Sequence, residues 1–271
     1  MGFTFNMVNN KNSYRRFIGY QKTKYLWTEY FDNLHMFFTE TCRKPPSINK
    51  NLRLGKLVEQ FVFHEIDQDE RLDLTTSNIQ IFNSKITIGE LDCIIADDQG
   101  PIHIEIIYKF YLYDPQIKGE INRWIGPNRN DSLAQKISKL KNKQLPLLHR
   151  SETKETLKKL DLSPSKIRQK VCFKAQLFTP FNQEKVSYDY INTDCIIGKY
   201  IRKDEIVSFK KHKFYIPSKL DWLIIPHNEV PWLDSEGFSS EIEMWLSSKK
   251  SPLCWIKSPE EILEKIFIVW W

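Results

Sequence analysis

The chain has 271 residues, 41% of them hydrophobic, so it can bury a substantial core as one large domain or two small ones. Its 40 basic and 34 acidic residues give a net charge of +6, which favours a polyanionic partner without requiring one. The five cysteines are scattered and form no CxxC pair, which argues against a disulfide framework and against a zinc ribbon.

Residues 1–50 mix aromatic and charged side chains and run up to the helix-breaking pair Pro45 and Pro46. We expect an N-terminal helical extension in this range. The chain shows neither the apolar core of a secretory signal nor a run of about 18 apolar residues. A cytoplasmic protein that does not enter a membrane is therefore expected.

Residues 51–190 carry the clearest periodic patterns. Leu54, Leu57, Val58 and Phe61 recur at helical spacing and predict a largely buried helix. Three runs of alternating apolar and polar residues within 78–112 predict an antiparallel meander of three strands. A second helix over DSLAQKISKL and a further strand within 164–181 follow. The order α, β, β, β, α, β indicates a mixed α/β core.

Residues 191–271 give less regular patterns. Strands are predicted at 194–201, 205–216 and 221–226, and capped helices at 239–246 and 258–267. The basic and aromatic stretch 199–222 suits contact with nucleic acid, but its composition is equally that of a cationic edge strand. We expect this region to be a C-terminal elaboration packed on the same domain.

A hairpin at the centre of the chain carries the first candidate site. Its polar turn is centred between Asp98 and Gln99, so symmetric pairing places Asp92 opposite Glu105, where like charges destabilise a sheet. Mg²⁺ or Mn²⁺ prefers oxygen ligands and would offset the repulsion. The alternative is an ordinary solvated strand face that Lys109 or an arginine neutralises.

Period-two alternation extends the polar face of this hairpin. Glu90 shares that face with Asp92, and His103 shares it with Glu105. His103 is a candidate general base or a support for the metal ligands, and a structural role is the alternative.

Glu59 is the second acidic candidate. It lies between Val58 and Phe61 in the predicted buried helix, where a carboxylate is costly unless it is paired or binds a metal. The alternative is a position on the helix flank, beside Gly55, from which the side chain reaches water.

This series of parts resembles the PD-(D/E)xK nuclease superfamily over residues 52–180. That resemblance implies a restriction-endonuclease-like αβββαβ core in which acidic residues hold Mg²⁺ or Mn²⁺ and a lysine assists the attacking water. The segments LGKLVEQF, GELD, HIEIIYKFYL and GPNRNDSLAQKISKL are also similar to the bacterial family catalogued as domain of unknown function 1853, along most of the chain. The catalytic residues implied are Glu59, Asp92, Glu105 and Lys109, of which Glu59, Asp92 and Glu105 would bind the metal.

The lysine spacing departs from the superfamily pattern. Glu105 and Lys109 are four residues apart where two is usual, and Ile107 stands at the expected lysine position. On a regular strand their Cα atoms would be about 13 Å apart. Either a β-bulge at 106–108 brings Lys109 to the attacking water, or Lys109 contacts the substrate instead.

The segment GPNRND precedes the second predicted helix and is a possible phosphate site, with free backbone N–H groups and the amide of Asn128. The alternative is a plain helix start capped by Ser132 and Gln135. Lys136 opens a basic stripe that faces either nucleic acid or solvent. The nucleic-acid-binding candidates are Asn128, Lys136, Lys139 and Lys143, and the residues expected to support the metal ligands are Glu90, His103 and Asp131.

Our first hypothesis is a Mg²⁺- or Mn²⁺-dependent nuclease that hydrolyses phosphodiester bonds of DNA or RNA. The second is a catalytically degenerate module of the same fold that binds nucleic acid or a protein partner. The third is an acidic hairpin with a purely structural role. The sequence contains no GxSxG, HExxH, GxxxxGK[ST] or GxGxxG, which removes the enzyme classes that those motifs mark.

Overall fold

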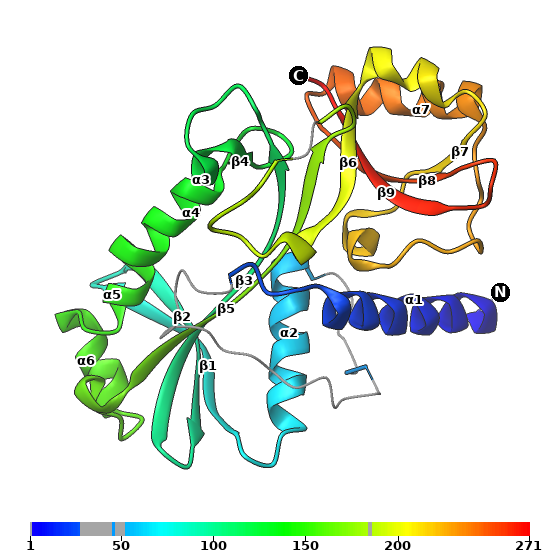
Figure 1. Ribbon diagram of the computed structural model, residues 1–271. Coiled ribbons are helices and arrows are strands. Elements are labelled where there is room, and N and C mark those ends of the chain that lie inside the picture. The colour runs from blue at the N-terminus through cyan, green and yellow to red at the C-terminus, as the bar shows by residue number, and fades with distance from the viewer. Residues whose placement is uncertain (1, 28–44, 47–51, 184–185) are drawn as a thin grey trace. The chain divides into compact units, whose positions relative to one another are not determined.

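The computed structural model describes residues 2–27, 45–46, 52–183 and 186–271, and their side chains from residue 11 onward. It is a mixed α/β structure, as the sequence predicts (Figure 1). The described α-helices are α1 (Gly2–Lys22), α2 (Leu54–Asp67), α3 (Glu120–Arg123), α4 (Leu133–Lys139), α5 (Leu145–Leu147), α6 (Ser151–Lys158) and α7 (Ser235–Ser247). The strands are β1 (Asp73–Asn83), β2 (Ile86–Asp97), β3 (Gly100–Tyr113), β4 (Trp124–Ile125), β5 (Arg168–Pro180), β6 (Ile196–Arg202), β7 (Lys213–Tyr215), β8 (Leu253–Lys257) and β9 (Leu263–Val269).

The nine described strands form one mixed sheet. Their hydrogen-bonded order is β1-β2-β3-β5-β6-β9-β8-β7, with β4 paired to β3. β1, β2 and β3 are antiparallel neighbours, which confirms the predicted meander. The β5–β6 and β6–β9 pairs are parallel. β7 is an edge strand in this order, in agreement with the second interpretation of the basic stretch around it.

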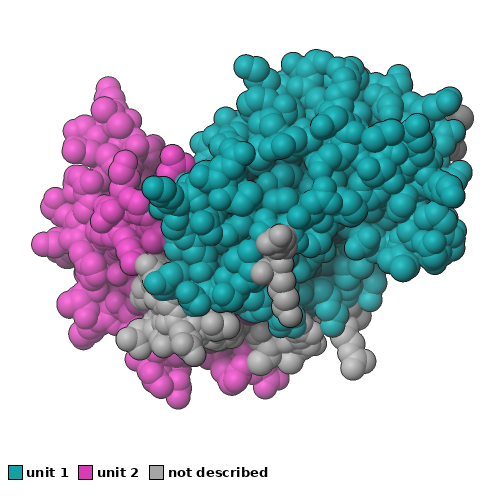
Figure 2. Space-filling model, turned by 45° about the horizontal axis from the view of Figure 1, so that its top comes forward, with its two compact units in different colours: residues 1–24, 109–134, 175–271 teal, residues 25–108, 135–174 magenta. Residues whose placement is uncertain are grey.

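The chain divides into two compact units, each assembled from separated segments (Figure 2). Unit 1 comprises residues 1–24, 109–134 and 175–271, and unit 2 comprises residues 25–108 and 135–174. β3 and β5 each contribute to both units, and β3 changes unit at Lys109. The domain division expected at residues 50 and 190 stays a prediction.

The core of unit 2 forms around the predicted helix and meander. The apolar face of α2 is buried, with Leu57 and Val58 each 2% exposed and Phe61 inaccessible. α2 and α6 contact β1, and the π-helical segment η1 (Leu140–Gln144) contacts β2. One apolar cluster of this unit comprises Ile79, Ile81, Leu91, Ile94, Leu147, Leu148, Leu157 and Ile167.

The core of unit 1 joins α7 to the C-terminal strands. Phe214 of β7 stacks on Phe238 of α7, with ring centroids 4.0 Å apart. α1 contacts the 3₁₀ segment η5 (Lys219–Leu223). Within the described ranges, no helix has both the length and the apolar character needed to cross a membrane. Among the described residues, four buried cysteines form no disulfide: Cys93, Cys172, Cys195 and Cys254.

The helix predicted at 258–267 is wrong, because its capping signal closes a turn instead. Ser258 Oγ accepts the N–H groups of Glu260 at 3.2 Å and Ile262 at 3.3 Å, and the turn leads from β8 into β9. β9 is nearly inaccessible from Ile266 to Val269 and pairs on both edges. A fully buried strand lacks the alternation that would have distinguished it from a helix.

Two predicted strands of unit 1 are also wrong in part. In the range 205–216, residues 205–209 belong to the 3₁₀ segment η4 (Lys203–Phe209), and only β7 is a strand. The segment 221–226 begins within η5 and contains no strand. The predictions at 194–201 and 239–246 are confirmed as β6 and α7. The N-terminal helix is confirmed over α1, and residues 28–44 and 47–51 of the expected extension lie outside the described residues.

Candidate functional site

The hairpin of β2 and β3 has the predicted register. Cys93 pairs with Ile104 and Asp97 with Gly100, so one further step along the ladder sets Asp92 against Glu105. The regular β2–β3 pairing itself spans Cys93–Ile104 to Asp97–Gly100. The N–H of Ile106 donates to Asp92 Oδ2 at 2.8 Å. A backbone donor thereby fixes the orientation of the Asp92 carboxylate.

Glu105 is held from two sides in the interior of unit 2. Its side chain has no exposed surface, so the alternative of a solvated strand face is wrong for this residue. His103 Nε2 lies 3.1 Å from Glu105 Oε1, and Gln144 Nε2 donates to Oε2. Gln144 is the last residue of η1. π-helical segments occur frequently at functional sites, and this one supplies the Gln144 amide that donates to the Glu105 carboxylate.

The hydrogen-bond network assigns the tautomer of His103. Gln169 Nε2 donates to the carbonyl of Leu145 at 2.8 Å and lies 3.1 Å from His103 Nδ1. An amide NH₂ has two donors, so Nδ1 accepts the second of them and Nε2 carries the proton that faces Glu105. Both donors to Glu105 are therefore neutral groups.

Asp92 lies in an unfavourable electrostatic environment. Burial, followed by the negative charge of Glu105, raises the pKa of Asp92 to about 7. The charge of Glu59 acts in the same direction, while the N–H of Ile106 and the charge of Lys136 act against it. The charges of Glu59, Asp92 and Glu105, all in unit 2, thus influence one another.

Glu59 is buried, as its position in the helix predicts, with 9% of its surface exposed. Burial raises the pKa of Glu59 in spite of an ion pair with Lys56 at 2.7 Å. Lys56 Nζ also contacts Glu90 at 2.6 Å and Asn78 Oδ1 at 2.6 Å. Burial lowers the pKa of Lys56, but its bonds to the two glutamates outweigh that effect and raise it. Glu90 is therefore engaged in an ion pair with Lys56.

Lys136 of α4 is the cation that influences Asp92. Its Nζ donates to Gln144 Oε1 at 2.7 Å, and the same amide donates to Glu105 through Nε2. Lys139 and Lys143, which share the predicted basic stripe, are exposed to solvent. The stripe is thus divided, because Lys136 is half-buried and engaged inside the unit.

The predicted residues between 109 and 131 belong to unit 1. Lys109 pairs with Asp131 at 2.7 Å, and both side chains are more than a third exposed. Asn128 Oδ1 accepts the backbone N–H of Ser251 at 2.8 Å. The GPNRND segment is closed by a bond from Gly126 N to Asp131 O at 2.7 Å. A Cβ at Gly126 would lie 1.9 Å from Asp131 Oδ1, so a larger residue there would displace the Asp131 carboxylate.

The carboxylates of unit 2 fit a hard divalent cation that retains water. Within the described residues, Asp92 Oδ1 accepts no hydrogen bond, and each bonded oxygen of Glu105 keeps a second lone pair. The described residues include no group of three or more His, Cys, Asp or Glu side chains placed to hold a metal ion. Mg²⁺ is often bound by one or two carboxylates with water completing the shell, and Asp92 and Glu105 would supply such a pair.

Sequence reasoning missed three residues of this site. Gln144 and Gln169 reach Glu105 and His103 from a π-helical segment and from the start of β5, and no local motif marks them. Lys56 lies three residues before Glu59 on α2, a spacing that places two side chains together and that signals the pair.

A scan against family models matches this chain over residues 26–269, to the family described as Domain of unknown function (DUF1853). No curated protein and no solved structure matches the chain significantly. The match covers most of both units, including the carboxylates of unit 2. The chain therefore belongs to the DUF1853 family.

Proposed function

We propose that unit 2 is the catalytic module of a metal-dependent phosphodiesterase that hydrolyses DNA or RNA. The observation that carries the proposal is the placement of the half-buried Asp92 beside the inaccessible carboxylate of Glu105 on the β2–β3 hairpin, where burial and the neighbouring charges raise the pKa of Asp92. A divalent cation relieves that repulsion and gains a site at the same time. The net positive charge of the chain suits a polyanionic substrate.

The resemblance to the PD-(D/E)xK superfamily belongs to this proposal. α2, β1, β2, β3, α4 and β5 occur in the αβββαβ order, with α3 and β4 inserted before α4 and with α5 and α6 inserted between α4 and β5. Glu59, Asp92 and Glu105 occupy the helix, the second strand and the third strand of that series.

The site residues of unit 2 have separate roles in the proposed reaction. Asp92 and Glu105 hold Mg²⁺ or Mn²⁺, and Glu59 with its Lys56 partner orients the acidic cluster. The bound ion would polarise the phosphate and lower the pKa of a coordinated water. Neutral donors from His103 and Gln144 keep the Glu105 carboxylate in place.

Lys136 is our choice for the residue that stabilises developing negative charge. Its charge acts on Asp92, and its Nζ is already positioned by Gln144. Lys109, by contrast, is engaged by Asp131 in unit 1. Gln144 joins the lysine to the carboxylate, so the amide must share Glu105 Oε2 with the metal or move away from it.

Thermal unfolding tests the metal site directly. Wild type, Asp92→Asn and the control Asp98→Asn are compared in EDTA, Mg²⁺ and Mn²⁺; Asp98 is an exposed residue of the same hairpin. Metal at one hundred times its Kd stabilises a folded protein by about 2.7 kcal/mol, so the Tm of wild type and the control should rise. The Asp92→Asn protein should gain nothing. Proteins whose Tm rises with metal are then incubated with single- and double-stranded DNA and RNA, and cleavage is measured.

A second candidate function is favoured by the hydrogen bonds of Glu105, because both of its carboxylate oxygens already have partners inside unit 2. It is a non-catalytic module that binds nucleic acid or a protein. Its signature is salt-sensitive nucleic-acid binding that is unchanged by EDTA, together with no metal effect on the Tm of wild type. That pair of results would overturn the phosphodiesterase proposal.

A further inference from the structure

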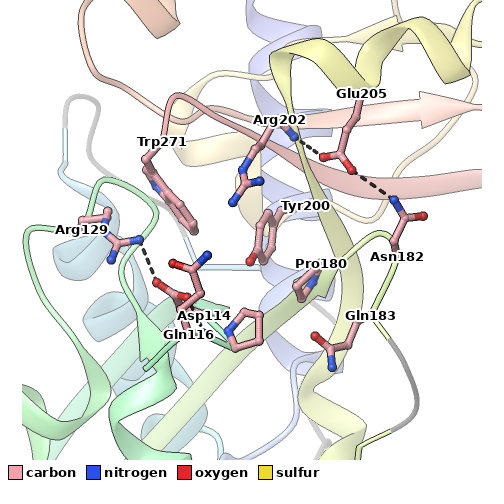
Figure 3. Close-up of a pocket in the computed structure, with 11 residues that line it drawn as sticks. Asp114, Gln116, Arg129, Pro180, Asn182, Gln183, Tyr200, Arg202, Glu205 and Trp271 are labelled. Carbon is pink, nitrogen blue, oxygen red and sulfur yellow. Dashed lines mark hydrogen bonds and ion pairs between the residues drawn. The ribbon is translucent and has the colours of Figure 1, made fainter. Parts of the chain in front are cut away.

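Unit 1 contains a cavity of about 640 Å³. It lies where β5 and β6 end and is also lined by the C-terminal residue Trp271, which follows β9 (Figure 3). β5, β6 and β9 are consecutive parallel strands, and all three run toward this end of the sheet. Ligands of open α/β sheets bind outside the carboxyl ends of parallel strands, and the volume is typical of small-molecule sites.

The two acidic side chains of the cavity are already occupied. Asp114 accepts from the guanidinium of Arg129 at 2.9 Å and from the backbone N–H of Gln116 at 3.0 Å. Glu205 accepts from the backbone N–H of Arg202 at 2.8 Å and from Asn182 Nδ2 at 3.2 Å. The carboxylates are thus used to shape the wall.

The four charged side chains of the lining, Asp114, Glu205, Arg129 and Arg202, sum to no net charge. Arg129 is already paired with Asp114, so the guanidinium of Arg202 is the cationic group left to a ligand. Figure 3 shows its side chain extending from the end of β6 toward Trp271 and Tyr200. Among the described residues, no carboxylate forms an ion pair with it. Arginine binds phosphate through two parallel hydrogen bonds, so this side chain favours a phosphate group in the cavity.

The aromatic part of the lining is held rigidly. The rings of Tyr200 and Trp271 lie with centroids 5.4 Å apart. Tyr200 OH donates to the carbonyl of Tyr113 at 2.8 Å, and Trp271 Nε1 donates to the carbonyl of Pro127 at 3.0 Å. The guanidinium carbon of Arg129 lies 4.6 Å from the centroid of the Trp271 ring. Fixed ring surfaces favour a planar ligand group, because little side-chain freedom is lost on binding.

Two amide side chains complete the lining. Gln116 and Gln183 border the cavity, and within the described residues their amide groups make no hydrogen bond. A primary amide both donates and accepts, which matches the mixed edge of a nucleobase. A simple anion would use neither the rings nor the acceptor oxygens of these amides.

We propose that this cavity binds a nucleotide, with its phosphate on Arg202 and its base against Tyr200 and Trp271, within reach of Gln116 and Gln183. A free mononucleotide and the terminal nucleotide of a strand share this chemistry. The site lies in unit 1 and does not depend on the proposed activity of unit 2.

Isothermal titration calorimetry in EDTA tests this site apart from the metal site. The probes are nucleoside 5′-monophosphates, ribose 5-phosphate, inorganic phosphate and 5′-phosphorylated tetranucleotides. The proteins are wild type, Arg202→Gln and the control Lys199→Gln, which removes one exposed positive charge from the same strand. Arg202→Gln should weaken mononucleotide binding by at least about tenfold, and Lys199→Gln by less than about twofold.

The probe series separates the two parts of the ligand. Ribose 5-phosphate should bind at least about tenfold more weakly than a mononucleotide, because it lacks the stacked base. Tighter binding of the tetranucleotide identifies a strand end as the ligand, and equal binding identifies the free nucleotide. Absence of saturable binding, or binding that Arg202→Gln leaves unchanged, would overturn the proposal. Equal unfolding midpoints of the three proteins show that the variants are folded, and Asp92→Asn should bind like wild type.

Discussion

Both units bury charge, but they satisfy it in different ways. In unit 1, Lys265 of β9 is 6% exposed and donates to Gln176 Oε1 at 2.9 Å and to the carbonyl of Trp222 at 2.6 Å. Burial lowers the pKa of Lys265 to about 7, and no neighbouring charge contributes to the shift. In unit 2, both burial and like charges raise the pKa of Asp92.

This difference separates a structural charge from a functional one. Lys265 has neutral acceptors and relieves its own burial by losing a proton. Asp92 faces Glu105 and Glu59, so its loss of charge leaves two further acids in the same cluster. Lys56 pairs with Glu59 and the charge of Lys136 acts on Asp92, but the three acids outnumber these two lysines, whereas the ammonium group of Lys265 is held by two neutral acceptors. Perturbed carboxylates in such surroundings are typical of sites that bind or react.

The largest expected effect is the loss of cleavage when a metal ligand is removed. Asp92→Asn and Glu105→Gln should each lower the rate of metal-dependent phosphodiester hydrolysis by at least about 1,000-fold, because metal stabilisation contributes several kcal/mol. Both changes conserve shape, and the control Asp98→Asn should cleave at the wild-type rate. Rates are measured on fluorescent DNA and RNA in Mn²⁺. Wild-type rates in either ligand variant would remove these residues from the mechanism.

The next effect concerns stability and pH. The pKa of Asp92 is raised in the folded state to about 7, so the folded protein binds a proton that the unfolded chain has released. Without metal, wild type should therefore lose stability as the pH rises from about 4 to about 7. Asp92→Asn removes this loss and should be more stable than wild type at pH 8, by up to about 4 kcal/mol.

Urea unfolding in EDTA across this pH range measures the difference, with Asp98→Asn as the control. The two proteins should converge near pH 4. Saturating Mn²⁺ should restore wild type relative to Asp92→Asn, because the cation replaces the proton. If Asp92→Asn remains the more stable protein in saturating Mn²⁺, the hairpin has the purely structural role of our third hypothesis.

The third effect compares two lysines that lie in different units. Lys136→Gln should slow cleavage by about 100-fold, since it removes both a charge near Asp92 and the anchor of Gln144. Lys109→Gln breaks one ion pair that is more than a third exposed and should cost less than about fivefold. Initial rates with saturating Mn²⁺ are compared, and Lys154→Gln on α6 controls for loss of charge. The reverse order would restore Lys109 as the lysine of the site.

Local patterns predicted the frame of the site. The turn at Asp98 and the alternation around it fixed the register, and helical spacing buried Glu59. The immediate surroundings of Glu105 were not predictable, because Gln144 and Gln169 come from segments distant in sequence. The basic stripe also concealed the special position of Lys136, since spacing on a helix does not reveal which of its lysines the amide of Gln144 will engage.

The C-terminal region shows the converse. Ser258 and the acidic residues after it form a valid capping signal, yet tertiary pairing of β9 with two strands overrides it. The cavity that ends at Trp271 was equally invisible in the sequence, because its lining comes from five separate segments.

The smallest effect tests whether the two neutral acceptors of Lys265 satisfy its buried ammonium group without a further charge. Its folded pKa lies below its unfolded value, so the cost of burial is full below pH 7 and declines as the pH rises from about 7 to about 10. Wild type should therefore gain stability over that range.

Lys265→Met removes this cost but leaves Gln176 Oε1 and the carbonyl of Trp222 without the Lys265 donor, so the net gain at pH 7 should be about 1 kcal/mol. Urea unfolding at pH 7 and pH 10 measures both values, and Lys199→Gln provides the control. A variant that loses several kcal/mol at both pH values would show that the ammonium group is required for the fold, and the contrast with Asp92 would then rest on like-charge repulsion alone.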